Sequence, residues 1–149
     1  MPIGEICSRA VVVVQRHESV LEAAKLMRQY HVGDVVVIEE RDGVRVPVGL
    51  VTDRDLVVEI MATGLDANVM TVEDIMEPEL ACVKDTTGIF ETVQYMRSRS
   101  IRRVPVVDEH DALLGILSLD DLLELLSEEL LAIAKLVKCQ RQKETKHRQ

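Results

Sequence analysis

The chain has 149 residues, of which 47% are hydrophobic and 30% charged, and its formal net charge at pH 7 is −8. This length accommodates one domain or two small halves that share a core, and the composition is that of an ordinary globular protein. The net negative charge and the scarcity of aromatic residues (two Tyr, one Phe, no Trp) argue against a nucleic-acid partner, which calls for basic side chains and stacking platforms.

Targeting signals and membrane spans are missing from the residue pattern. The first residues lack the charged stretch and apolar run of a signal peptide, and no uncharged apolar stretch approaches the ~20 residues of a membrane helix. Cys7, Cys82 and Cys139 are odd in number and widely spaced, which is typical of reduced thiols. The sequence therefore predicts a cytoplasmic protein without a membrane partner.

The first half predicts the order strand, helix, strand, strand, helix. A β-branched run opens it, an amphipathic stretch ends at Gly33, and Asp42-Gly43 is a hairpin signal between two further apolar runs. Thr52 opens the second helix, which closes near Gly64. The predicted elements lie at residues 11–14, 20–32, 35–38, 46–51 and 52–63.

The second half repeats this order. Strands are predicted at 80–83, 104–107 and 113–117, one helix includes residues 89–96, and the last begins at Leu119. Residues 4–39 align with 73–108 at a constant offset of 69, and residues 49–56 align with 115–122 after a three-residue slip.

This duplication predicts an α+β fold of two β-α-β-β-α repeats related by a pseudo-two-fold axis. The first two strands of each repeat should be parallel because a right-handed crossover joins them. We expect a first repeat at 3–66, a second at 67–138 with an extended C-terminal helix, and a flexible basic tail at 139–149. A cleft between two such repeats is a natural place for a ligand.

The last predicted helix carries more leucine than one buried face requires. It either covers its own domain or contacts a second subunit, and the sequence leaves both open. Residues 138–149 hold five basic residues and one acid, which fits either a solvated terminus or a contact with an acidic partner.

One motif occurs in both repeats: a glycine, two apolar residues, a hydroxyl residue, any two residues and an aspartate. It reads Gly49, Thr52, Asp55 in the first copy and Gly115, Ser118, Asp121 in the second. A hydroxyl followed three residues later by an acid is typical of a helix capping box. Its recurrence where a strand ends and a helix begins also favours a ligand site, because a carboxylate there can accept both hydroxyls of a ribose. Backbone groups of the neighbouring strands, at Val36 and Pro105, are candidates to contact an adenine edge.

Signals of catalysis or metal binding are missing. His17, His31, His110 and His147 have no metal-ligand spacing with each other or with cysteine. Neither a phosphate-loop lysine motif nor a nucleophile signature occurs. We therefore expect no catalytic residues, no metal site and no enzymatic activity.

Together these motifs resemble a tandem pair of CBS (cystathionine β-synthase) domains, over roughly residues 3–126. The residues that carry the resemblance are Ser19-Val20-Leu21-Glu22-Ala23-Ala24 with Met27, Val35-Val36-Val37-Ile38-Glu39, Gly49-Leu50-Val51-Thr52-Asp53-Arg54-Asp55-Leu56, and their second copies at Met96, Val104-Pro105-Val106-Val107-Asp108 and Gly115-Ile116-Leu117-Ser118 with Asp121-Leu122. Residues 72–76 also resemble the family's link between its two units.

The resemblance implies a non-catalytic sensor that binds an adenosyl ligand, AMP, ADP or ATP, between the repeats and signals to an effector protein not identified by the sequence. It further implies a homodimer, with Thr52 and Asp55 holding ribose in one cleft and Ser118 and Asp121 in the other. The alternatives are an S-adenosylmethionine or NAD sensor, and a structural dimerisation module with empty clefts.

The resemblance also implies that the two clefts differ. Basic residues before the second strand of one repeat reach phosphate in the other repeat's cleft, and here these are Arg102 and Arg103. Gly33 and Asp34 occupy the matching positions of the first repeat. We therefore expect phosphate in the Thr52/Asp55 cleft. The Ser118/Asp121 cleft, which would face Asp34, should hold a neutral or cationic adenosyl group or stay empty.

Overall fold

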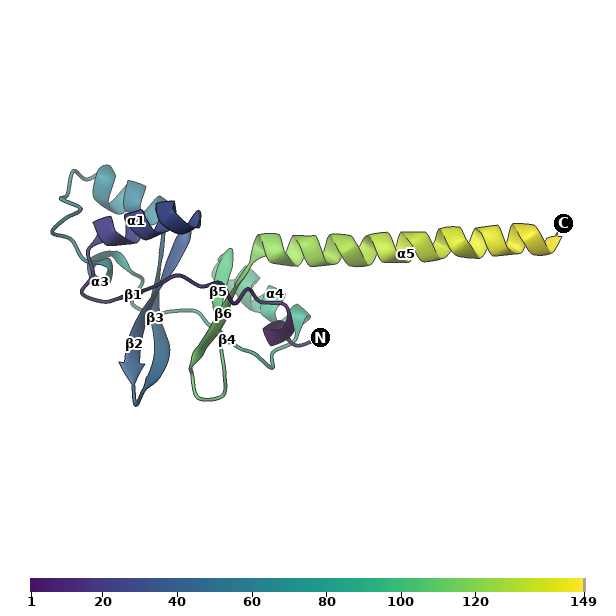
Figure 1. Cartoon of the computed structure of the whole chain (residues 1–149), viewed down its shortest axis with the longest axis horizontal. Coiled ribbons are helices and arrows are strands. Elements are labelled where there is room, and N and C mark those ends of the chain that lie inside the picture. Colours follow the sequence, from purple (N-terminus) through teal and green to yellow (C-terminus); the bar gives the residue numbers. More distant parts are fainter. Residues whose placement is uncertain (149) are drawn as a thin grey trace. The chain divides into compact units, whose positions relative to one another are not determined.

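The computed structural model describes residues 1–148 and comprises two compact units, residues 1–117 and 118–148 (Figure 1). The elements are η1 (Ile3–Glu5), β1 (Val13–Gln15), α1 (Val20–Tyr30), β2 (Asp34–Arg41), β3 (Val44–Thr52), α2 (Asp53–Asp55), η2 (Leu56–Met61), α3 (Val72–Ile75), β4 (Val83–Lys84), α4 (Ile89–Arg99), β5 (Arg103–Val107), β6 (Leu113–Ser118) and α5 (Leu119–Arg148).

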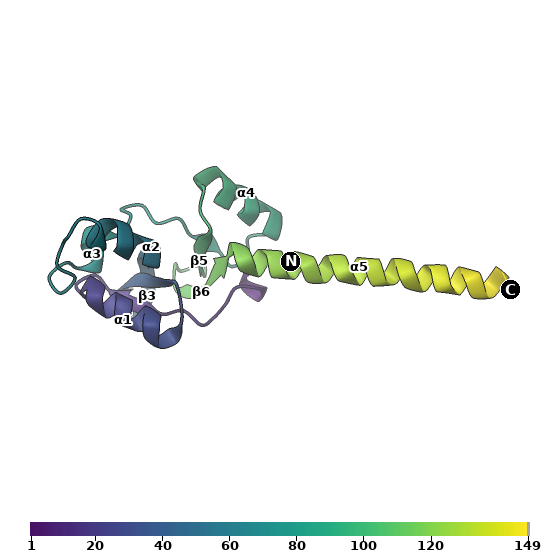
Figure 2. The ribbon, with the colours of Figure 1, turned by 90° about the horizontal axis from the view of Figure 1, so that it is seen from above.

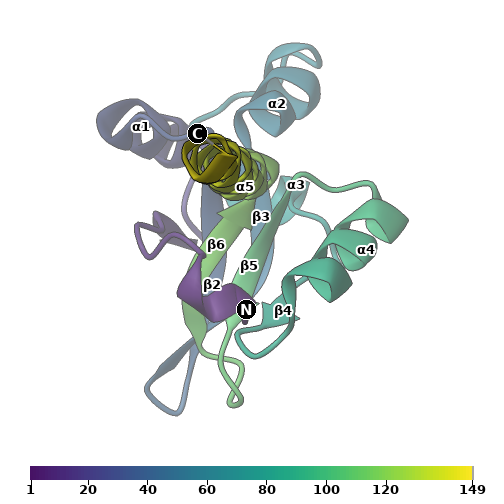
Figure 3. The ribbon, with the colours of Figure 1, turned by 90° about the vertical axis from the view of Figure 1, so that its right-hand side faces the viewer.

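The predicted α+β class and the duplicated order of elements are confirmed. The strands form two three-stranded sheets, β1-β2-β3 and β4-β5-β6 (Figure 3). In the first, β1 is parallel to β2 and pairs Val14 with Val37; in the second, β4 is parallel to β5 and pairs Val83 with Val106. These pairs are related by the same offset of 69 residues, so the repeats share their strand register as well as their sequence pattern.

Equivalent residues also end the two amphipathic helices. Ser19 caps α1, its hydroxyl accepting a hydrogen bond from the Glu22 amide at 3.2 Å. The helix ends at His31 in the left-handed conformation, with φ 54°, and α4 ends in the same way at Ser100. The sequence predicted an end at Gly33; the turn comes two residues earlier because His31 itself adopts the left-handed conformation.

The helix after β3 departs from a regular α-helix. The α-helical turn α2 is followed directly by η2, a π-helical stretch in which the Ala62 amide donates to the Val57 carbonyl at 2.8 Å. Figure 2 shows this segment beside α1. The two enclose part of an apolar core that also includes Val14, Val35, Val37 and Val51, each at most 1% exposed.

The opening segment of each repeat packs on the other repeat. The Ile3 and Gly4 amides donate to Thr87 and Asp85 carbonyls at 2.8 and 2.9 Å, and Ser8 and Ile116 exchange two backbone hydrogen bonds. Conversely, the Val72 amide, at the start of α3, donates to the Glu18 carbonyl at 2.9 Å. This exchange joins the repeats within residues 1–117 into one compact unit.

Two glycines make the exchange possible. A Cβ at Gly115 would meet the Ser8 carbonyl oxygen and lie 2.8 Å from Cys7 Sγ, and a Cβ at Gly49 would lie 2.5 Å from Met76 Sδ. The same position of each repeat therefore lacks a side chain, because the opposite opening segment passes directly over it.

The second unit is essentially α5, an unbroken helix of 30 residues. Residues 139–148, which the sequence set apart as a flexible tail, are helical because they are mostly Lys, Arg, Gln and Glu, good helix formers without glycine or proline. Within residues 1–148, α5 included, no helix combines the length and apolar character needed to cross a bilayer.

Candidate ligand-binding site

Thr52 and Asp55 lie at the junction between β3 and α2. The Thr52 hydroxyl accepts a hydrogen bond from the Asp55 amide at 3.2 Å, and the Thr52 amide donates to Asp55 Oδ2 at 2.9 Å. The predicted capping box is therefore present. Among residues 1–148, Asp55 Oδ1 has no hydrogen-bond partner, so the cap uses only half of the carboxylate.

A cavity of about 570 Å³ opens beside this cap. It is contained within residues 1–117 and draws on both repeats, since Thr52 and Asp55 come from the first, and Arg99 and Arg103 from the second. Its full lining is Leu50, Thr52, Asp55, Glu77, Glu79, Leu80, Ala81, Arg99, Ser100, Ile101 and Arg103. The volume lies within the range of small-molecule sites, roughly 300–1,000 Å³.

Arg103, at the start of β5, is the predicted phosphate ligand that the structure brings to this cavity. It is already engaged: its Nε lies 2.7 Å from Asp34 Oδ2, with the two side chains 33% and 18% exposed. Asp34 and Arg103 occupy equivalent positions, 69 residues apart, so the residues expected to distinguish the two clefts form an ion pair with each other.

The environment of Asp34 raises the pKa of its carboxyl group above the ordinary value of 3.8. Burial is the main cause because it disfavours the charged form; Arg103 opposes the shift, and the nearby Asp53 carboxylate adds to it. Gly33 leaves room for this cluster, since a Cβ there would lie 3.3 Å from both Arg103 Nη2 and Asp53 Oδ2.

The other predicted residues of this site lie elsewhere. Arg102 is exposed and does not line the cavity. Val36 and Pro105 are buried within β2 and β5 and do not line it either. The Val36 amide donates to the Val12 carbonyl at 2.9 Å.

Three charged lining residues were not predicted from the sequence. Arg99 ends α4 and lies over the Tyr95 ring, 5.1 Å from its centroid, while Glu77 and Glu79 flank Pro78 in the segment between α3 and β4. The sequence signal that could have found them was proximity along the chain, since Arg99 comes four residues before Arg103, and Glu77 directly follows the 72–76 link.

Ser118 and Asp121 repeat the local geometry at the start of α5. The Ser118 amide donates to Asp121 Oδ2 at 3.0 Å, and the Asp121 amide donates to Ser118 Oγ at 3.1 Å. Both copies of the motif therefore form the same reciprocal cap. For this second copy the expectation of a ligand cleft remains a prediction.

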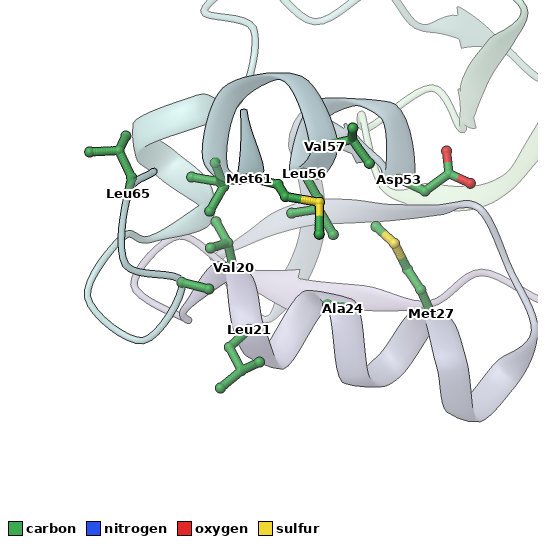
Figure 4. Close-up of a pocket in the computed structure, with 11 residues that line it drawn as sticks. Val20, Leu21, Ala24, Met27, Asp53, Leu56, Val57, Met61 and Leu65 are labelled. Carbon is green, nitrogen blue, oxygen red and sulfur yellow. The ribbon is translucent and has the colours of Figure 1, made fainter. Parts of the chain in front are cut away.

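A second cavity, of about 530 Å³, lies between α1 and the α2–η2 segment (Figure 4). Its lining is apolar except for Asp53, and the side chains of Val20, Met27, Leu56 and Met61 lie between the two helical segments. An apolar groove lacks the donors and acceptors that recognise a sugar, so the cavity at Thr52 and Asp55 is the candidate site. Among residues 1–148, no group of three or more His, Cys, Asp or Glu side chains is placed to hold a metal ion.

Comparison with known proteins identifies a family. The family model described as CBS domain matches twice, at residues 3–62 and 72–128. Hypoxic response protein 1 of Mycobacterium tuberculosis is 33% identical over 134 residues, which is 90% of each chain. The CBS domain-containing protein YhcV of Bacillus subtilis is 35% identical over 120 residues, 80% of this chain and 81% of that protein. An uncharacterised protein of Methanopyrus kandleri is 33% identical over 122 residues, 82% of this chain, which spans 61% of that protein's length.

Solved structures have the same fold. The crystal structure of Hypoxic Response Protein I with two coordinated zinc ions has a TM-score of 0.72 and 31% identity, over 83% of this chain and 98% of that one. A CBS domain pair in complex with 5′-methylthioadenosine and S-adenosyl-L-methionine has a TM-score of 0.73 over 85% and 99% of the chains, and at 22% identity it shows the fold alone. The two family matches and the paired sheets lead to one conclusion: the chain belongs to the CBS domain family and carries two CBS domains in tandem.

Proposed function

We propose that this CBS domain pair is a non-catalytic, cytoplasmic regulatory module that binds an adenosyl nucleotide, AMP, ADP or ATP, in the cavity beside Thr52 and Asp55. The proposal is based on the carboxylate of Asp55. Its Oδ2 accepts the capping hydrogen bond, its Oδ1 has no hydrogen-bond partner among residues 1–148, and it lies at the edge of a 570 Å³ cavity lined by residues of both repeats. A ligand in this position touches both repeats at once, as a sensor of their relative arrangement requires.

Ribose recognition falls to Asp55 and Thr52. A carboxylate offers about four acceptor positions, and the cap occupies one of them through Oδ2. Oδ1 can accept from the vicinal ribose hydroxyls while the cap stays intact. The Thr52 hydroxyl can also donate to the ligand while it accepts from the Asp55 amide.

Phosphate recognition falls to Arg103, assisted by Arg99. A guanidinium has five N–H donors, so Arg103 retains donors while Nε is paired with Asp34. Arg102 is outside the cavity, and Arg99 is the second arginine that the lining provides. The Asp34 carboxylate competes with phosphate for Arg103 and reduces the affinity for anions.

Acidic side chains in the same cavity favour a second candidate, S-adenosylmethionine. Glu77 and Glu79 line the cavity, and with Asp55 they outnumber its two arginines. The sulfonium and ammonium groups of S-adenosylmethionine would be attracted to these carboxylates, whereas a nucleotide phosphate would be repelled. A structural neighbour, the pair in complex with 5′-methylthioadenosine and S-adenosyl-L-methionine, supports this alternative by fold-level analogy.

Ser118 and Asp121 are proposed to hold a second adenosyl group by the same chemistry, because their cap has the same geometry.

The signal to an effector protein depends on thermodynamic linkage. A ligand that binds one arrangement of the repeats more tightly than another shifts the population toward that arrangement, by no more than the difference in affinity. The effector protein then binds the favoured arrangement.

The test is calorimetric titration of AMP, ATP and S-adenosylmethionine into the wild type and two matched variants. Asp55→Asn keeps an oxygen to cap α2 but removes the charge that holds ribose, so we expect at least a ten-fold loss of affinity for the ligand that binds. Asp74→Asn is the control because Asp74 Oδ2 caps the Thr71 amide at 2.9 Å in the same way, outside the cavity. Equal affinities in both variants, or no binding by the wild type, would refute the proposal.

A further inference from the structure

The Asp34–Arg103 ion pair joins the two repeats at the edge of the candidate cavity. Asp34 begins β2 of the first repeat and Arg103 begins β5 of the second, and Arg103 also lines the cavity. The Asp34 side chain is only 18% exposed, and within residues 1–148 Arg103 is its one ion-pair partner. The charge of this partly buried carboxylate is therefore balanced by a single guanidinium, the same one that the cavity offers to a ligand.

The second charge beside Asp34 has the same sign as Asp34 itself. Asp53, at the start of α2, faces the ion pair, since a Cβ on Gly33 would lie 3.3 Å from both Asp53 Oδ2 and Arg103 Nη2. The Asp53 amide donates to the Gly33 carbonyl at 2.9 Å, which holds α2 against the start of β2. Thr52, the neighbour of Asp34 across the β2–β3 pair, carries no charge.

Arg103 is what keeps Asp34 ionised. Burial and the Asp53 carboxylate both raise the pKa of Asp34, and Arg103 opposes them. Among the described residues, no group of α1, which also packs on β2, shifts this pKa. Any change that weakens the hold of Arg103 on Asp34 therefore favours the protonated carboxyl.

A phosphate in the cavity changes this balance in one direction. If Arg103 turns from Asp34 to the phosphate, the carboxylate loses its cation. If the guanidinium binds both, using its five N–H donors, a second anion lies beside the carboxylate. The loss of a positive charge and the approach of a negative one both disfavour the charged form of a carboxyl. In either geometry Asp34 holds a proton more tightly than before.

We propose that the binding of a nucleotide phosphate at Arg103 makes Asp34 take up a proton from solvent, so that the module binds AMP or ATP more tightly as the pH falls. The inference rests on the proposed function, because it requires a phosphate in this cavity. Its sign follows from linkage: a ligand that raises the proton affinity of a group takes up protons on binding, and its own affinity then decreases as the pH rises. The proton neutralises the carboxylate that competes with phosphate for Arg103.

The test is calorimetric titration of AMP into the full chain at about pH 5.5 and about pH 7, each in two buffers of different ionisation enthalpy. The dependence of the heat on the buffer gives the number of protons taken up per AMP bound. Asp55, Glu77 and Glu79 also line the cavity, and the phosphate itself titrates near pH 6, so the decisive quantity is the difference between the wild type and Asp34→Asn. We expect the wild type to take up at least about 0.3 proton more per AMP at the lower pH.

The affinities give a second reading of the same experiment. We expect Asp34→Asn to bind AMP several-fold more tightly than the wild type near pH 7, and this advantage should shrink toward pH 5.5 as the wild-type carboxyl becomes protonated. Equal proton uptake by the two proteins, or an advantage that grows as the pH falls, would overturn the inference. An absence of AMP binding by the wild type would refute the proposed function and this inference with it.

Asp111→Asn is the matched control. Asp111 Oδ1 pairs with Lys84 Nζ at 2.5 Å, so it is also an acid in an ion pair, but its side chain is 65% exposed and does not line the cavity. We expect this variant to keep the proton uptake of the wild type. A loss as large as that in Asp34→Asn would show that the uptake is not specific to the cavity, and would overturn the inference.

A direct measurement on the wild type needs no variant of Asp34. Its carboxyl carbon is followed by carbon-13 NMR as a function of pH, with saturating AMP or with saturating adenosine, which has the same base and ribose but no phosphate. The titration midpoint of Asp34 should lie at higher pH with AMP than with adenosine. Equal midpoints, or a lower midpoint with AMP, would contradict the coupling between phosphate and proton.

Discussion

Arg103→Ala is expected to weaken AMP or ATP binding at least ten-fold, and Asp34→Asn to strengthen it several-fold. Both effects come from one ion pair, Arg103 Nε to Asp34 Oδ2 at 2.7 Å, at the side of the candidate cavity. Arg103→Ala removes the guanidinium group that binds phosphate. Asp34→Asn removes the carboxylate that competes with phosphate for this guanidinium, and it also removes a nearby negative charge, so Arg103 is left to pair with phosphate.

Arg102→Ala is the control for this experiment. Arg102 neighbours Arg103 in sequence and carries the same charge but is exposed and outside the cavity lining. We expect its substitution to change the calorimetric affinity by less than two-fold at 0.15 M salt. Equal losses in Arg102→Ala and Arg103→Ala would show that only the general positive charge matters. If S-adenosylmethionine is the ligand, Arg103→Ala should leave its affinity unchanged or increase it.

The raised pKa of Asp34 predicts a pH dependence of folding stability. A carboxyl whose pKa is higher in the folded than in the unfolded chain binds more protons when folded, so its favourable contribution is full below the unfolded value of 3.8. That contribution is lost as the pH rises through the folded pKa. We expect the free energy of unfolding of the wild type, relative to Asp34→Asn, to fall from pH 4 toward neutrality in urea titrations. A difference that rises with pH would contradict the burial of this group.

Gly115→Ala should lower the stability of the protein by about 2–3 kcal/mol and its Tm by roughly 5–10 °C. The added methyl would meet the backbone carbonyl of Ser8 and the Sγ of Cys7. Ser8 cannot retreat easily, since it exchanges two backbone hydrogen bonds with Ile116. The substitution therefore breaks the exchange of opening segments that joins the repeats.

Two other glycine-to-alanine variants serve as comparisons for Gly115→Ala in the same thermal unfolding experiment. Gly49→Ala should cost less than Gly115→Ala because its Cβ would meet the flexible side chain of Met76 rather than backbone. Gly88→Ala should cost least, since a Cβ there has no atom within 4 Å. The expected order of Tm loss is Gly115, Gly49, Gly88, and a Gly88 variant as unstable as the Gly115 variant would exclude the steric explanation.

The sequence by itself determined the duplicated architecture and the caps. Apolar periodicity and turn residues are local, so they specified the order of elements, and the offset of 69 residues correctly predicted that the repeats share their structure. The hydroxyl-to-aspartate spacing is also local, and it predicted the reciprocal hydrogen bonds of Thr52 with Asp55 and of Ser118 with Asp121.

Only the tertiary structure decided which residues meet across the repeats. The Arg103–Asp34 ion pair, the presence of Arg99 and Glu77 in one cavity with Asp55, and the passage of Cys7 and Ser8 over Gly115 all join positions far apart in the chain. Such contacts depend on how the two sheets pack against each other. The residue pattern along the chain does not say which residues of the two repeats lie close together in space. For the same reason Arg102 and Arg103, neighbours with the same charge in the sequence, end in different surroundings: one is exposed to solvent, and the other is paired at the edge of the cavity.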